Sequence, residues 1–215
     1  KPIIVPWDFT HVAEFALAHA INISNILKRD IILLHITEKK SAKKRAFEKL
    51  KKQAGQISDT HGFKIHPEVR SGSIFETIRE SAHESKAEMV VMGTHGRKGM
   101  QKLTGSWALK VMAHSKVPFL VVQEEPKKDK FQKIVFPIDF RSENKEKVKW
   151  VSYLSEKYNS KFFLFKRKVS DRGFKRKIAS NLHYVESFLK NNDVSYELHT
   201  SKGKKRGHRT LPSYA

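Results

Sequence analysis

Short apolar runs alternate with helical stripes along the first part of the chain. Five runs, at residues 3–5, 31–36, 64–69, 89–92 and 118–122, are rich in aliphatic side chains and predict strands. Between the first two runs, apolar residues recur at three- and four-residue spacing, which predicts a helix that begins near Thr10 or His11. The stripe consists of Ala13, Ala16, Leu17, Ala20, Ile23, Ser24 and Leu27.

Three further helices are expected between the later strands. One begins at Ser41, one follows a Ser-x-x-Glu capping box formed by Ser73 and Glu76, and a short one covers residues 106–115. Strands that alternate with helices run in the same direction, and continuous apolar strands are buried on both faces. The pattern therefore predicts an α/β domain, residues 1–125, with a doubly wound parallel five-stranded sheet.

The sequence repeats itself beyond a charged linker at residues 126–132. The segment from Ile134 to Phe140 resembles the segment from Ile3 to Phe9 at an offset of 131 residues, and helical patterns and an alternating strand follow. A glycine loop equivalent to residues 93–105 would fall beyond Ala215. We therefore expect a partial second domain at residues 133–200 with a poorly closed core, an altered or truncated C-terminus, and a basic, disordered tail at residues 201–215. The first residue is Lys1 rather than Met, which also suggests an altered or truncated sequence.

Charge and composition limit the function classes. The formal net charge is +21, and the part after residue 125 has 23 basic and 9 acidic residues. Such an excess suggests a polyanionic partner, although a solvated charged surface is the alternative. The chain has no Cys, which excludes disulfides and thiolate chemistry. It has neither an apolar run of membrane-spanning length nor a secretory signal, so a soluble, cytoplasmic protein is expected.

A glycine-rich segment carries the most specific chemistry. Four glycines lie between Gly93 and Gly105, after a buried strand and before the expected helix at Ser106. Glycine lets backbone N–H groups approach an anion, and the end of a parallel strand is where open α/β sheets bind ligands. The segment favours phosphate binding over a plain loop. Ser106 either contacts the phosphate or caps the helix. Because neither a Walker A nor a Gly-x-Gly-x-x-Gly motif occurs, kinase and dehydrogenase functions lose support.

The chain resembles the universal stress protein family. Nucleotide-binding members carry Gly-x2-Gly-x9-Gly-Ser/Thr after the fourth strand, and this chain has Gly93-x2-Gly96-x8-Gly105-Ser106. The resemblance includes the opening Val5-Pro6-x-Asp8-Phe9 and the strand end Leu34-His35-Ile36, and it covers residues 3–123 and part of 133–200. The chain is similar to a tandem-repeat member with an incomplete second repeat.

The resemblance implies strand order 3-2-1-4-5, pairing through the fifth strand as a homodimer or pseudo-dimer, and ATP, possibly with Mg²⁺, above strands 1 and 4. Asp8 would approach the ribose or a metal-bridged phosphate, and the motif glycines would hold phosphates. The predicted cofactor-binding residues are Pro6, Asp8, Ile36, Met92, Gly93, His95, Gly96, Gly105, Ser106 and Trp107. Alternatively, Asp8 is a loop carboxylate that caps the first helix. His95 is a binding rather than a catalytic residue in this interpretation.

The predicted function is a cytoplasmic stress-response protein that binds ATP or a related adenine nucleotide and regulates partners, with at most slow hydrolysis. The first alternative is a ligand-free, chaperone-like dimerising module. The second, nucleic-acid binding, depends only on the charge, because a buried strand explains Phe162, Phe163 and Phe165 better than base stacking. No metal-ligand spacing occurs. Asp139 matches Asp8, but we expect an inactive second site without a glycine loop.

Overall fold

The computed structural model describes residues 1–61, 64–93, 112, 115–126, 131–142 and 144–201. The chain forms two compact units, Lys1–Pro126 and Lys127–Ala215, which we call unit 1 and unit 2. Each unit has its own parallel sheet.

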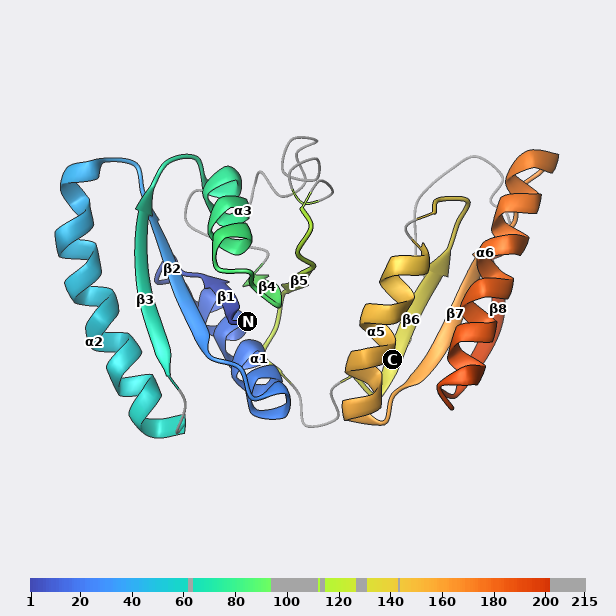
Figure 1. The fold of residues 1–215 in the computed structure, drawn as a ribbon, viewed down its shortest axis with the longest axis horizontal. Helices are drawn as coiled ribbons and strands as arrows, with labels where there is room; N and C mark the ends of the chain where they lie inside the picture. The colour runs from blue at the N-terminus through green and yellow to red at the C-terminus, as the bar shows by residue number, and fades with distance from the viewer. Residues whose placement is uncertain (62–63, 94–111, 113–114, 127–130, 143, 202–215) are drawn as a thin grey trace. The chain divides into compact units, whose positions relative to one another are not determined.

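Unit 1 contains the predicted five-stranded sheet. The strands are β1 (Ile3–Pro6), β2 (Ile31–Thr37), β3 (Ile65–Ser71), β4 (Met89–Gly93) and β5 (Phe119–Val122). They lie in the order β3-β2-β1-β4-β5 with every pair parallel (Figure 1). Both the parallel α/β architecture and the strand order 3-2-1-4-5 are therefore confirmed.

The helices of unit 1 follow the predicted periodicity. They are α1 (His11–Leu27), the 3₁₀ turn η1 (Lys40–Ala42), α2 (Lys43–His61) and α3 (Ile74–Glu84). The buried residues of α1 are the seven of the predicted stripe. The helix expected from Ser41 begins with a 3₁₀ turn, so α2 starts at Lys43. The helix expected at residues 106–115 lies outside the described residues, apart from Met112 and Ser115.

The predicted capping box has a different geometry. Ser73 is the N-cap of α3, but its hydroxyl makes no hydrogen bond to the helix backbone. The hydroxyl instead donates to Glu76 Oε2 at 2.7 Å. The carboxylate is a charged acceptor, so this is a strong hydrogen bond. The sequence signature therefore located the helix start correctly but misassigned the hydrogen bond.

The two faces of the five-stranded sheet are buried by different helices. Ile4, Leu34 and Val90, from three adjacent strands, form one cluster with Ile78 and Ala82 of α3. Their chain neighbours, such as Ile3 and Leu33, are equally buried and point to the opposite face. Right-handed crossovers place α1 and α2 on that second face, because β1, β2 and β3 follow one another in one direction across the sheet.

The three strands of unit 2 pair in the same way as the first three strands of unit 1. Its elements are β6 (Lys133–Ile138), α5 (Asn144–Tyr158), β7 (Lys161–Arg167), α6 (Arg172–Asn191) and β8 (Tyr196–Ser201). The strands are parallel and lie in the order β6-β7-β8. Ile3 pairs with Ile31 in unit 1, and Ile134 pairs with Phe162 in unit 2. The register is thus conserved at the offset of 131 residues seen in the sequence.

The core of unit 2 is closed on one face of its sheet. Phe162 and Leu164 are fully buried against α5 and α6, with Val148 and Val185 among their neighbours. On the other face, the Val135 side chain is 51% exposed. The expectation of a poorly closed core therefore applies to one face only, because both crossover helices lie on the same side.

The aromatic residues of β7 divide between the two faces of this sheet. Phe162 is buried as expected, whereas Phe163 and Phe165 are half-buried and stack on His199, with ring centroids 5.9 and 5.4 Å apart. The expectation of one buried strand was thus wrong for Phe163 and Phe165. Successive side chains of a strand point to opposite faces, and the described helices of unit 2, α5 and α6, both pack on the face of Phe162 and Leu164.

Candidate functional site

A cleft opens in unit 1 at the carboxyl ends of β1, β2 and β4. Here the strand order reverses, because β2 lies on one side of β1 and β4 on the other. Such a switch point is where ligands bind in open α/β sheets. The cavity has a volume of about 110 Å³. Its lining is Pro6, Trp7, Asp8, Thr10, Ala13, Leu34, His35, Ile36, Ile74, Ile78, Met92 and Gly93.

The loop after β1 is held against the sheet and α2. The Trp7 side chain is only 3% exposed, and its indole Nε1 donates to Gln53 Oε1 at 3.1 Å. The Trp7 backbone N–H donates to the Leu34 carbonyl at 2.8 Å, and His35 Nδ1 donates to the Trp7 carbonyl at 2.6 Å. These bonds satisfy the backbone of the loop and leave its next residues at the mouth of the cleft.

Phe9 has a strained backbone that surrounding contacts maintain. Its φ of 62° lies in the left-handed region, which is uncommon for a bulky residue. The ring packs on His35 with centroids 5.0 Å apart, and the ammonium nitrogen of Lys49 lies 3.7 Å above the ring centroid. Strain of this kind costs about 1–3 kcal/mol and persists where neighbours impose it. The turn that presents Asp8 is therefore a fixed conformation.

Asp8 stabilises this turn at the rim of the cleft. Its Oδ1 accepts hydrogen bonds from the Thr10 backbone N–H at 3.2 Å and the Thr10 hydroxyl at 2.5 Å. Thr10 is the N-cap of α1, and its hydroxyl oxygen accepts from the Ala13 N–H at 3.4 Å. The alternative that Asp8 caps the helix is wrong as stated, because Thr10 is the cap and Asp8 orients it.

Gly93 ends β4 in close contact with the first turn of α1. A Cβ atom built on Gly93 would lie 2.5 Å from Val12 Cγ1 and 2.6 Å from the Val12 carbonyl oxygen. Those distances are well below van der Waals contact. The fold therefore requires glycine at this position whether or not a ligand binds.

The structure brings together half of the predicted site residues. Pro6, Asp8, Ile36, Met92 and Gly93 all line the cleft. The remaining predicted residues lie outside the described part of the chain: His95, Gly96, Gly105, Ser106 and Trp107.

Sequence reasoning missed part of the apolar lining. Leu34 and Ile78 are fully buried beneath the cleft, and Ile74 on the first turn of α3 is 38% exposed beside it. The only sequence signal is that Ile74 directly follows the N-cap Ser73, because helix starts lie at the carboxyl ends of the strands in this fold.

Neither a metal site nor a membrane-spanning helix occurs among the described residues. Within these ranges, no group of three or more His, Asp or Glu side chains is arranged to hold a metal ion. None of the helices there combines the length and hydropathy needed to cross a bilayer.

Comparison with known proteins identifies the family. The profile of the universal stress protein family matches residues 1–123. A universal stress protein of Methanocaldococcus jannaschii is 31% identical over 146 residues, which cover 60% of this chain and 85% of that protein.

One solved structure shares the fold of this chain, and a second is similar to part of it. A universal stress protein from Archaeoglobus fulgidus aligns over 94% of this chain and 77% of its own length, with 16% identity and a TM-score of 0.71. A universal stress protein solved in complex with cAMP aligns over 57% of this chain and 96% of its own length, with 20% identity and a TM-score of 0.47. Because the family profile covers more than half of the residues, the chain belongs to the universal stress protein family.

Proposed function

We propose that unit 1 binds an adenine nucleotide, with ATP as the expected ligand, and acts in the cytoplasm as a stress-response regulator. Nucleotide occupancy would alter the binding of partner proteins, with at most slow hydrolysis. The observation that carries the proposal is the apolar cleft at the switch point between β1 and β4, with a carboxylate at its rim. Small-molecule sites are typically apolar clefts with a few polar groups at this place in the fold.

The described residues fit the base and the sugar of a nucleotide. Pro6, Ile36 and Met92 provide an apolar wall for the planar base. Asp8 can accept a hydrogen bond from a ribose hydroxyl while it holds Thr10. Because Phe9 and Trp7 fix the turn, little ordering is needed on binding, which favours affinity.

The residues that would contact the phosphates are inferred from the sequence motif. Gly93 is the last residue of β4, so the glycine-rich segment that follows starts at the edge of the cleft. Gly96, Gly105 and Ser106 would contact the phosphates, with Mg²⁺ as a counterion. His95 and Trp107 would lie beside them.

Isothermal titration with ATP, with and without Mg²⁺, tests the proposal. Saturable binding is expected in the parent chain and should be lost in Gly105→Val. Gly55→Val is the matched control, because a side chain at Gly55 meets open space. No saturable binding, or equal affinity of the parent and Gly105→Val for ATP, would refute the assignment.

A second pair of variants tests the apolar wall. Ile74→Ser removes apolar surface at the cleft and should weaken ATP binding about tenfold, given about 0.8 kcal/mol per buried methylene. Val135→Ser in unit 2 changes a side chain that is also exposed and should leave affinity unchanged. If both variants changed ATP affinity equally, ATP would not bind in this cleft.

The exposed edge of β5 favours a second function, strand-mediated pairing of copies. β5 lies at the end of the strand order, and Val121 is 39% exposed. Edge strands offer unpaired backbone groups to another chain. Sedimentation equilibrium should show a dimer that Val121→Lys weakens; a monomer at all concentrations would remove this function.

We also propose that unit 2 is a partial second copy of the domain. The conserved register at an offset of 131 residues supports this interpretation. Related chains should then show residue identities between their two parts at a similar spacing.

A further inference from the structure

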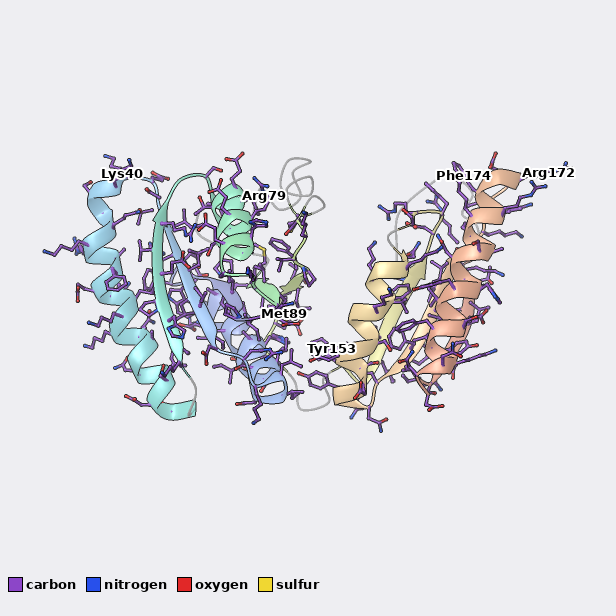
Figure 2. All side chains as sticks on the ribbon, in the orientation of Figure 1. Lys40, Arg79, Met89, Tyr153, Arg172 and Phe174 are labelled. Atoms are coloured by element: carbon purple, nitrogen blue, oxygen red, sulfur yellow. The ribbon has the colours of Figure 1, made fainter. Side chains whose placement is uncertain are left out.

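One end of unit 2 concentrates positive charge. Residues 166–177 contain seven Lys and Arg and a single acidic residue, Asp171. The segment runs from the end of β7 into the first turns of α6, and its cations from Arg167 onward are exposed. Figure 2 shows Arg172 and Phe174 at this end of α6. Among the described ion pairs, none involves a cation of this segment.

Two exposed aromatic rings lie at the same end. Phe140 follows β6, and Phe174 lies in the first turn of α6. Their rings are stacked, with centroids 4.4 Å apart and planes at 19°, yet they are 42% and 41% exposed. Large exposed apolar groups that gather at one place on a soluble surface indicate a binding site.

Buried amides hold the loop that carries Phe140. Asn181 of α6 is 5% exposed, and its Nδ2 donates to the carbonyls of Asp139 and Arg141 at 2.9 and 2.8 Å. Asn144 is 1% exposed and donates to Asp139 Oδ1 at 2.9 Å. The loop is therefore fixed before any ligand arrives, which lowers the entropic cost of binding.

A groove of about 450 Å³ runs beside the stacked rings. Its lining combines Phe140 with three cationic side chains, Arg141, Lys145 and Lys177. Arg141 is paired with Asp139, with Arg141 Nη2 and Asp139 Oδ2 2.5 Å apart, and Lys145 lies 5.2 Å above the Tyr184 ring. Lys177 and the neighbouring cations of α6 remain available for an anionic chain.

We propose that this end of unit 2 binds single-stranded nucleic acid. The Phe140–Phe174 pair offers a flat ring face on which an unpaired base can stack, and the surrounding cations track the phosphates. Single strands are favoured over duplexes because the bases of a duplex are stacked on one another and do not expose their ring faces to the protein. A nucleic acid is favoured over an anionic membrane because the cationic surface is a groove with stacked rings rather than a flat face. This site is distinct from the cleft of unit 1.

Fluorescence anisotropy of the full chain with a labelled 12-nucleotide oligo(dT) tests the proposal. Contacts to about four phosphates predict that affinity falls about 50-fold between 50 and 200 mM salt, from a slope of about −0.7 per phosphate. Phe174→Leu should weaken binding about 5- to 150-fold through lost stacking. The double variant Lys175→Gln/Arg176→Gln should make the salt dependence shallower.

Matched controls exist on α2 of unit 1. Phe47→Leu changes a ring that is 38% exposed, and Lys44→Gln/Arg45→Gln removes two exposed charges. Both should leave affinity unchanged. The proposal is overturned by equal losses in the two variant sets, by equal affinity for a 12-base-pair duplex, or by no binding at 50 mM salt. It is also overturned if the chain binds phosphatidylserine vesicles, if Phe174→Leu weakens that binding, and if the oligonucleotide does not bind. Loss of ATP binding in Gly105→Val tests unit 1 separately.

Discussion

Gly93→Ala should destabilise unit 1 although it adds a single methyl group. That methyl would lie 2.5 Å from Val12 Cγ1, 2.6 Å from the Val12 carbonyl oxygen and 2.9 Å from its carbonyl carbon. The Val12 side chain can rotate, but the carbonyl belongs to the first turn of α1 and moves only with the helix. Overpacking of this kind costs about 1–3 kcal/mol.

Gly55→Ala is the matched control with the opposite sign. Gly55 lies within α2, and a Cβ built there meets nothing within 4 Å. Alanine in place of glycine inside a helix stabilises by about 0.5–1 kcal/mol. The two variants, chemically identical, should thus differ by about 1.5–4 kcal/mol in the free energy of unfolding.

Urea denaturation followed by tryptophan fluorescence measures this difference. The two units need separate probes, because a chain with two compact units need not unfold in one step. In a Trp150→Phe background, the remaining tryptophans, Trp7 and Trp107, both belong to unit 1. If Gly93→Ala is as stable as the parent, the close approach of β4 to α1 does not exist in solution and the packing argument fails.

Three further predictions concern the loops at the strand ends. Thr10→Ala should cost about 1 kcal/mol of unit 1 stability because the N-cap of α1 is lost, whereas Thr10→Ser should be nearly neutral; urea titration distinguishes them. Trp7→Phe should cost about 1 kcal/mol through the lost hydrogen bond to Gln53, in addition to the cost of the cavity that the smaller buried ring leaves, and a double-mutant cycle with Gln53→Leu should show coupling; additive effects would exclude the bond. Burial raises the pKa of Asp139, but hydrogen bonds from Arg141 and Asn144 outweigh burial, so the pKa lies below its ordinary value of 3.8. The Asp139 carboxylate therefore stabilises unit 2 above pH 3.8, and this contribution is lost as the pH falls through the lowered pKa of the folded state. Asp139→Asn should flatten the pH dependence of unit 2 unfolding between about pH 5 and pH 2, followed by the fluorescence of Trp150 of unit 2 in a Trp7→Phe/Trp107→Phe background; an unchanged slope would contradict the assignment.

Local periodicity predicted most of unit 1. The buried stripe of α1 and the five strands agree with the sequence pattern, because burial against a parallel sheet imposes a regular spacing on apolar residues. Details that depend on one hydrogen bond were missed. The Ser73 hydroxyl donates to Glu76 instead of capping the backbone, and α2 starts after a 3₁₀ turn. The pattern of apolar residues contains no information about such choices.

The candidate site was predicted only in part for a related reason. Pro6, Asp8 and Met92 follow or end predicted strands, so their meeting at one edge of the sheet can be anticipated. Ile74 belongs to the wall because α3 crosses the sheet at the switch point. That placement depends on packing against Ile4, Leu34 and Val90.

The sequence by itself determined the order of elements, the parallel sheet and the membership of a family, since these depend on residue spacing along one chain. The tertiary structure alone decided which distant residues touch. It placed Gly93 against Val12, so that glycine is required, and it stacked Phe140 on Phe174 at a cationic surface. The physical reason is that parallel strands and crossover helices join segments far apart in sequence, and the contacts between them follow from side-chain volume and direction rather than from local pattern.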